Sequence, residues 1–104
     1  MRIEPSKRFI KDAKSLAKKY KKISYDLELL QKILLDNPES GIPLGNNIFK
    51  IRIPNSSIPT GKSGGFRVIT YFLSDDILYL LTIYSKSDRE SISTGEIDTM
   101  VEDL

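Results

Sequence analysis

The chain has 104 residues, of which 39% are hydrophobic and 29% are charged, as in an ordinary globular protein with one modest core. Cys and His are both absent, which excludes thiol nucleophiles, the usual zinc sites and every catalytic arrangement built on an imidazole. No apolar run approaches the ~18 residues of a membrane span, and the first residues lack the apolar stretch of a signal peptide. We therefore expect one cytoplasmic domain, residues 1–104, with no membrane segment and no bound metal or cofactor.

The net charge of +2 conceals a strong asymmetry along the chain. Through Arg67 there are 14 Lys and Arg residues against 6 Asp and Glu, whereas from Val68 onward there are 2 against 8. Such polarity within one small domain favours an anionic partner, and nucleic acid is the commonest partner of that kind. A solvated surface of mixed charge is the alternative that the counts leave open.

The first 38 residues predict two consecutive helices. Ser6 can cap a helix on which apolar side chains recur at helical spacing from Phe9 to Tyr20. A second helix is expected from Ser24 to the stop at Asn37-Pro38, because the residue before a proline avoids helical geometry. So short a link predicts an antiparallel helical hairpin packed on the rest of the chain. The side of the first helix opposite its apolar residues carries a stripe of lysines: Lys7, Lys11, Lys14, Lys18 and Lys22.

From Ile48 onward the hydrophobic residues alternate with a period of two, which is typical of β-strands. In the strand expected from Ile48 to Ile53, Lys50 and Arg52 point away from the apolar side chains. We expect their face of the sheet to be open, because Lys and Arg are almost never fully buried. Further strands are expected at residues 66–73 and 77–84, the latter central because it is apolar on both faces. The predicted fold class is α+β, with the helical hairpin packed on a β-sheet.

Turn-forming and capping residues assign two other segments. Residues 39–47 contain Gly41, Pro43 and Gly45 and are expected to form a loop. Residues 93–96 have the spacing of a capping box and precede apolar residues at helical intervals, which predicts a short C-terminal helix. The carboxylates of this last part of the chain are expected to form a solvated acidic end, without a pair for sugar hydrolysis or a cluster for a metal.

The segment Thr60-Gly61-Lys62-Ser63 has the last residues of a phosphate-binding loop, but its spacing excludes that motif. The motif requires a Gly five positions earlier, where this chain has Ser56, and it opens a helix, whereas Gly64-Gly65 here precede a strand. The segment is expected to be either simply a flexible loop between strands or a loop whose mobile Lys62 closes over a bound polyanion.

Five side chains are candidates for binding or catalysis. If the first two long strands are neighbours, Lys50, Arg52 and Arg67 can share one face, although the sequence does not fix the register. Three cations so close repel one another unless an anion is bound, which favours anion binding over a purely structural role. Tyr84 and Lys86 end the third long strand. Tyr84 is either a core aromatic residue or a group that stacks on a base or donates a proton.

In the order of its elements and in three sequence segments, the chain resembles the RelE/ParE superfamily of bacterial toxins, and the HigB-like RelE branch looks closest. The resemblance runs from about Phe9 to Lys86 and implies two helices packed on a small curved, mostly antiparallel β-sheet. It also implies a short N-terminal edge strand, for which residues 2–4 are available. The three segments are Phe49-Lys50-Ile51-Arg52, Gly61-Lys62-Ser63-Gly64-Gly65-Phe66-Arg67-Val68-Ile69 and Leu80-Leu81-Thr82-Ile83-Tyr84-Ser85-Lys86.

The resemblance implies a toxin that enters the ribosomal A site and cleaves messenger RNA, held inactive by a cognate antitoxin protein. The ribose 2′-hydroxyl attacks the adjacent phosphate, and converging cations stabilise the negative charge of the transition state without a metal. By position, Lys50 and Arg52 match the family's basic pair, Arg67 its phosphate-gripping arginine, and Lys86 a further basic residue. Nearby positive charges favour a neutral amine, so Lys50 is the expected proton acceptor, whereas an arginine stays charged.

Some RelE toxins use a tyrosine on or near the C-terminal helix, but this chain has no aromatic residue after Tyr84, which is therefore assigned that role. Two alternatives share the fold: a ParE-type inhibitor of DNA gyrase that cuts no RNA, and a decayed toxin that only binds its antitoxin. The cluster of Lys50, Arg52 and Arg67 favours the nuclease. Four residues of the lysine stripe are expected to bind ribosomal RNA: Lys7, Lys11, Lys14 and Lys18.

Overall fold

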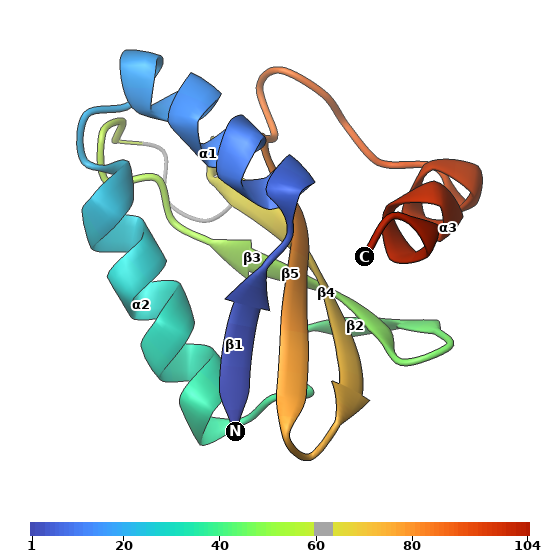
Figure 1. Cartoon of the computed structure of the whole chain (residues 1–104). Helices are drawn as coiled ribbons and strands as arrows, with labels where there is room; N and C mark the ends of the chain where they lie inside the picture. The colour runs from blue at the N-terminus through green and yellow to red at the C-terminus, as the bar shows by residue number, and fades with distance from the viewer. Residues whose placement is uncertain (60–63) are drawn as a thin grey trace.

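The computed structural model describes residues 1–59 and 64–104. These residues form three α-helices and a single β-sheet, arranged as Figure 1 shows. The elements in chain order are β1 (Arg2–Pro5), α1 (Lys7–Lys19), α2 (Ile23–Asp36), β2 (Ile42–Gly45), β3 (Ile48–Ile53), β4 (Phe66–Ser74), β5 (Ile77–Ser85) and α3 (Thr94–Glu102).

The strands lie in the order β1-β5-β4-β3-β2, so that the three long strands form the middle of the sheet. β1 pairs parallel with β5, and every other neighbouring pair is antiparallel. The N-terminal strand therefore lies at an edge, as the family resemblance implies, and β5 occupies an interior position, as its apolar sequence predicts. The predicted α+β class, with two helices before a mostly antiparallel sheet and a short helix after it, is confirmed.

The helix ends follow the expected capping chemistry at two of three N-termini. The Ser6 hydroxyl accepts a hydrogen bond from the Phe9 amide, 3.0 Å, and donates to the Leu81 carbonyl, 2.9 Å, which joins α1 to β5. Ser93 caps α3 by accepting from the Glu96 amide at 3.2 Å. By contrast, α2 begins at Ile23, one residue before the predicted start, and Lys22 at its N-cap makes no side-chain capping bond.

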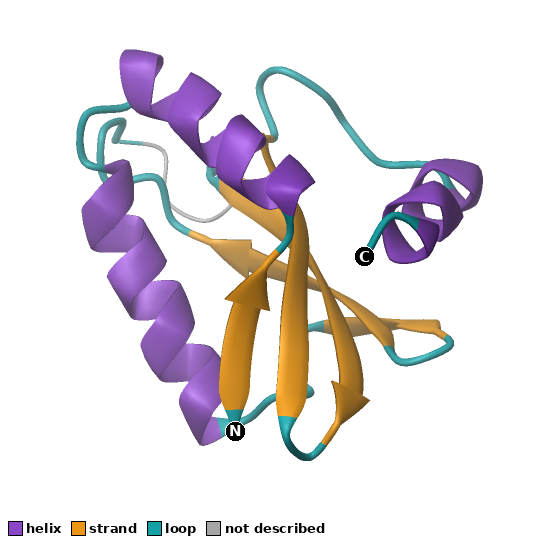
Figure 2. Cartoon of the chain, viewed as in Figure 1, coloured by secondary structure: helices purple, strands orange, loops and turns teal. Residues whose placement is uncertain are grey.

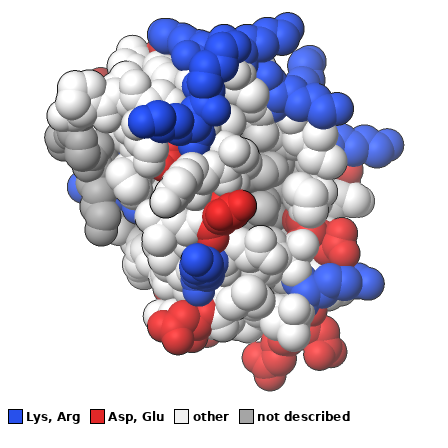
Figure 3. Space-filling model, turned by 90° about the vertical axis from the view of Figure 1, so that its left-hand side faces the viewer, with Lys and Arg blue, Asp and Glu red and all other residues white. Residues whose placement is uncertain are grey.

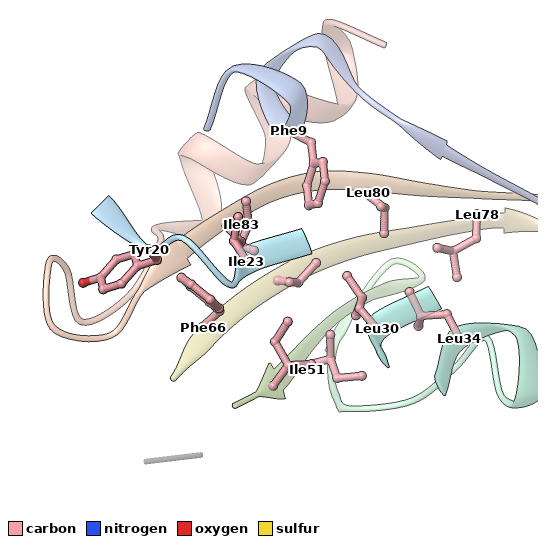
Figure 4. Close-up of a cluster of buried hydrophobic side chains, with 12 residues drawn as sticks. Phe9, Tyr20, Ile23, Leu30, Leu34, Ile51, Phe66, Leu78, Leu80 and Ile83 are labelled. Carbon is pink, nitrogen blue, oxygen red and sulfur yellow. The ribbon is translucent and has the colours of Figure 1, made fainter. Parts of the chain in front are cut away.

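The main core lies between α1, α2 and one face of the sheet (Figure 4). Leu30 and Leu34 of α2 pack on sheet residues that include Phe66 and Leu78, all of them with almost no exposed surface. Tyr20, which was expected as the last apolar residue of the first helix, stands just after α1, and its ring packs edge-on against Phe66 at 5.5 Å. α1 and α2 diverge from their short link, so each covers a different part of the sheet (Figure 2).

The other face of the sheet is partly covered by α3. Ile97 and Met100 of α3 form a second cluster with sheet residues Ile48, Ile69 and Tyr84. The expectation that this face is open is therefore only partly correct. Its apolar part receives α3, because side chains such as Ile69 would otherwise leave a large exposed apolar patch, while Arg52 remains exposed.

The segment expected to be a loop contains a fourth antiparallel strand, β2, and this prediction was wrong for Ile42–Gly45. A two-residue turn connects β2 to β3, with positive φ at both Asn46 (53°) and Asn47 (62°), the geometry that favours a tight hairpin. Gly41 has φ of 103°, and a Cβ there would meet the Lys50 carbonyl oxygen at 2.5 Å. Pro43 is tolerated because β2 is an edge strand and needs hydrogen bonds on one side only.

Within residues 1–59 and 64–104, no helix is both long enough and apolar enough to cross a membrane.

Candidate functional site

Three polar side chains are direct neighbours across the middle strands of the sheet, and a fourth lies beside them on the same face. Arg52 of β3 is the direct cross-strand partner of Arg67 of β4, and Arg67 is in turn the partner of Tyr84 of β5. Directly opposed residues project from the same face of a sheet, with Cβ atoms about 5 Å apart. Lys50 stands two residues before Arg52 and opposite Ile69, so it shares this face. The register thus brings together four of the five residues predicted for catalysis, which we call the cationic row: Lys50, Arg52, Arg67 and Tyr84.

Burial differs sharply along the cationic row. Arg52 is exposed and Lys50 is half-buried, but Arg67 is only 3% exposed. The guanidinium of Arg67 donates to the Phe66 carbonyl at 3.4 Å. Burial lowers the pKa of Arg67, the positive charge of Arg52 lowers it further, and Tyr84 acts in the opposite direction. The prediction of an open face is wrong for Arg67, because Arg52 and Tyr84 stand directly beside it on the same face and Tyr84 packs in the cluster that α3 covers.

Tyr84 is 6% exposed and packs in the cluster beneath α3. Its hydroxyl is fully enclosed and has no hydrogen-bond partner among the described residues. Burial raises the pKa of Tyr84 above the usual value, and the positive charges of Arg67 and Arg89 offset part of that rise. The phenol therefore stays protonated at neutral pH, as a hydrogen-bond donor requires. Stacking of the ring on a base would first require the side chains above it to move.

Lys86 directly follows β5 and is exposed. Its amide donates to the Gly65 carbonyl at 3.0 Å, which ties the end of β5 to the start of β4, close to the cationic row. On either side of it the hydroxyls of Ser85 and Ser87 lie 2.8 Å apart, and each lies 3.4 Å from the Tyr20 hydroxyl. These contacts fix the backbone that carries Lys86. The predicted RNA-binding residue Lys62 lies outside the described residues.

The lysines predicted to bind RNA from the first helix are all exposed on α1: Lys7, Lys11, Lys14 and Lys18. In the view of Figure 3 the cations gather at the end of the molecule where α1 lies, and acidic side chains lie toward the opposite end. The ammonium of Lys19 contacts the Asp88 carboxylate at 3.5 Å. The C-terminal end of α1 therefore adjoins the turn that carries Lys86.

Sequence reasoning missed Arg89, which lies in the connection between β5 and α3. Its guanidinium binds the Glu96 carboxylate through two hydrogen bonds, of 2.8 and 3.3 Å, and its Nε donates to the Ser91 carbonyl at 3.0 Å. Its positive charge also lowers the pKa of Tyr84, a member of the cationic row. The available signal was its isolation as one basic residue in an acidic segment. Glu96 is accordingly part of an ion pair, and the prediction of a merely solvated carboxylate was wrong there.

Converging cations with a protonated phenol at one end form a site suited to a phosphate group that gains negative charge during a reaction. In the part of the chain that the structure describes, no group of three or more Asp, Glu, His or Cys residues could hold a metal ion.

A mostly antiparallel sheet with helices on both sides and a cationic row across three strands defines the class as a small α+β protein with basic side chains aligned on one face of its sheet. Residues 1–102 match the family model described as the RelE toxin of the RelE/RelB toxin-antitoxin system. The chain belongs to the RelE toxin family. It is thus a toxin of a toxin-antitoxin system, and its expected partner is an antitoxin protein. The narrower assignment to the HigB-like branch stays a prediction.

Proposed function

We propose that this toxin is an endoribonuclease that cleaves messenger RNA on the ribosome and thereby stops translation. The ribose 2′-oxygen attacks the adjacent phosphorus, the bond from phosphorus to the 5′-oxygen breaks, and a 2′,3′-cyclic phosphate remains. The observation that carries this proposal is the direct pairing of Arg52 with Arg67 on one face of the sheet, with Tyr84 as the next member of the row.

Two guanidinium groups on directly opposed residues repel each other, and an anion bound between them removes that repulsion. The transition state of this reaction carries more negative charge on the phosphoryl oxygens than the substrate does, so the two cations stabilise it preferentially. Arg67 is enclosed and already held in place, whereas Arg52 is exposed and can approach the phosphate from solvent. In this arrangement Arg67 provides fixed charge and Arg52 completes the site.

Two protons must move during the cleavage. Lys50 accepts the proton of the 2′-hydroxyl, because arginine stays charged at any ordinary pH and cannot serve as a base. Tyr84 donates a proton to the leaving 5′-oxygen, a role for which its position beside Arg67 suits it, because burial raises its pKa and the positive charge of Arg67 offsets part of that rise. Because the Tyr84 hydroxyl is enclosed, this step requires the side chains that cover it to shift when RNA binds.

Binding energy away from the reacting phosphate would come from the exposed lysines of α1, which we assign to ribosomal RNA, and from Lys86, which we assign to a phosphate next to the cleaved one. These contacts are electrostatic and do not depend on sequence. We further propose that the protein acts as one domain in the cytoplasm, where ribosomes and messenger RNA are found, and that no metal takes part.

The test replaces residues of the cationic row and maps the 5′ ends of cellular messenger RNA after induction of the toxin. Arg52→Ala suits this test because Arg52 is exposed, and Arg67→Ala and Arg67→Lys complete the series. We expect each alanine variant to reduce cleavage by roughly 10²-fold or more, which is the usual effect of removing one group that stabilises transition-state charge. Growth arrest should weaken in parallel. Lys32→Ala, an exposed cation on α2, is the control and should cleave normally.

Full growth arrest by a folded Arg52→Ala variant and a folded Arg67→Ala variant would remove the catalytic assignment. DNA breaks without new messenger RNA ends would instead identify the alternative, a ParE-type inhibitor of DNA gyrase.

A further inference from the structure

A hollow of about 510 Å³ lies on the same face of the sheet as the cationic row, between the turn that joins β2 to β3, the sheet surface and α3. Figure 1 shows α3 and the β2–β3 hairpin on the same side of the molecule. Its volume lies within the range of about 300 to 1,000 Å³ that is usual for small-molecule sites. Its lining includes Lys50, Tyr71, Tyr84, Ile97, Asp98 and Glu102.

The walls of the hollow differ in chemistry. Its inner part is apolar and aromatic, with Tyr71 from β4 and Ile97 from α3. Its α3 side carries Asp98 and Glu102, which are four residues apart, lie on one face of the helix and are both exposed. These two negative charges disfavour a phosphate at that point. They are good acceptors for the amino groups of a ligand that has a flat apolar body.

The hollow and the cationic row are continuous. Lys50 lines the hollow and stands two residues before Arg52, a separation of about 7 Å along a strand. Tyr84 belongs to the row and also lines the hollow, and its enclosed hydroxyl has no partner among the described residues. A nucleotide whose phosphate lies on the row can therefore place its base in the hollow, with the ribose spanning the interval.

We propose that this hollow is a base-binding subsite that selects nucleobases with an exocyclic amino group over uracil. Aromatic and apolar side chains hold the flat body of a base, and carboxylates accept hydrogen bonds from amino groups such as N4 of cytosine. Uracil presents a carbonyl oxygen at that position, which a carboxylate repels. The inference rests on the proposed function, because it takes RNA as the ligand, and it adds a residue-level source of preference for the base beside the cut.

The test measures the binding of cytidine 3′-monophosphate and uridine 3′-monophosphate to the purified toxin by calorimetry. These two probes share the ribose and the phosphate and differ only at one edge of the base, where cytosine has an amino group and an N3 acceptor and uracil has a carbonyl oxygen and an N3–H donor. We expect the cytidine nucleotide to bind about tenfold more tightly, which corresponds to one good contact to a base edge. The double variant Asp98→Ala with Glu102→Ala should lose this preference, and it should bind the uridine nucleotide at least as tightly as the unmodified protein does, because the repulsion of the uracil carbonyl is removed.

Two controls separate the base from the phosphate. The double variant Glu90→Ala with Asp103→Ala removes two exposed carboxylates that do not line the hollow, and it should keep the preference for cytidine. Val101→Trp places a large side chain in the hollow and should abolish the difference between the two nucleotides, while the binding of ribose 5-phosphate stays unchanged.

Equal affinity for the two nucleotides, a preference that survives loss of both carboxylates, or no binding of either nucleotide would overturn the inference. Binding of neither nucleotide would instead indicate that the hollow binds a protein partner. Selective nucleotide binding by a toxin that leaves messenger RNA intact would refute the proposed nuclease and keep the subsite. Cleavage of messenger RNA by a toxin that binds both nucleotides equally would refute the subsite and keep the proposed nuclease.

Discussion

At the scale of single residues, burial separates the cationic row into an exposed part and an enclosed part. Arg52 is open to solvent, whereas Arg67 and Tyr84 are buried, Tyr84 within the cluster beneath α3. Charges and dipoles that are already fixed need no reorganisation when a transition state forms, so enclosure favours catalysis. It also destabilises the fold, because an enclosed hydroxyl without a hydrogen-bond partner costs about 1 to 3 kcal/mol.

Tyr84→Phe removes that enclosed hydroxyl and keeps the ring. We expect the free energy of unfolding to rise by about 1 kcal/mol at neutral pH, because the unpartnered polar atom is gone and the packing of the ring is kept. Cleavage of messenger RNA should fall, because the proposed proton donor is lost. Urea unfolding and mapping of RNA ends measure the two effects. A less stable variant would mean that the hydroxyl is satisfied in solution.

The difference in stability between the unmodified protein and Tyr84→Phe should also depend on pH. Since the pKa of Tyr84 is raised in the folded state, the folded protein holds this proton more tightly than the unfolded chain does. The resulting contribution to stability is complete below the ordinary tyrosine value of 10.0 and is lost as the pH rises through the folded-state pKa. Unmodified protein should therefore lose stability above pH 10, and Tyr84→Phe should lose less. Tyr20→Phe is the contrasting variant. Hydrogen bonds to Ser85 and Ser87 lower the pKa of Tyr20, which is the opposite direction to the shift of Tyr84.

At the scale of elements, the parts that depend on local signals could be predicted from sequence. The cap at Ser6 and the alternation around Lys50 each act within a few residues, and both α1 and β3 formed as expected. β2 could not be predicted in this way, because its Gly and Pro residues favour a loop and the strand exists only through pairing with β3. The enclosure of Arg67 and the pair between Arg89 and Glu96 depend on packing between distant segments.

α3 is the element whose attachment is simplest to test. It is held by Ile97 and Met100 and by the bond from Glu96 to Arg89, which lies in the connection before the helix. Glu96→Gln keeps the backbone capping contact with Ser93 and removes the charge. We expect faster hydrogen exchange at the amides of α3 in this variant, with little change in β4 and β5. Glu90→Gln is the control, and equal exchange in both variants would show that the ion pair does not hold the helix.

The same ion pair predicts how α3 responds to acid. The bond to Arg89 is the main cause that lowers the pKa of Glu96 below its ordinary value of 4.5. A lowered carboxyl pKa contributes stability that is present above the ordinary value and is lost as the pH falls through the folded-state pKa. Hydrogen exchange of α3 in the unmodified protein should therefore approach that of Glu96→Gln below about pH 4.5. A difference that persists unchanged at lower pH would contradict this assignment.

At the scale of the whole molecule, the charge asymmetry of the sequence becomes a spatial one. The basic residues before Val68 supply both the stripe on α1 and the cations of the row, whereas the acidic residues after it lie largely in turns and on α3. The sequence could predict the stripe, since helical spacing alone places those lysines together. It could not predict that Lys19 contacts Asp88 and so brings one end of α1 to the turn that carries Lys86.

This arrangement predicts a salt dependence of ribosome binding to which α1 contributes separately from the cationic row. Each phosphate contact by a lysine adds roughly 0.7 to 0.9 to the slope of log affinity against log salt concentration. The triple variant Lys11→Ala, Lys14→Ala and Lys18→Ala should therefore lower the magnitude of that slope by about 2, measured by co-sedimentation with ribosomes between low and physiological salt. Lys32→Ala on α2 is the control and should leave the slope unchanged. An unaltered slope in the triple variant would mean that the lysine stripe faces solvent in the complex, and the docking surface would then have to be sought around Arg52 and Lys86.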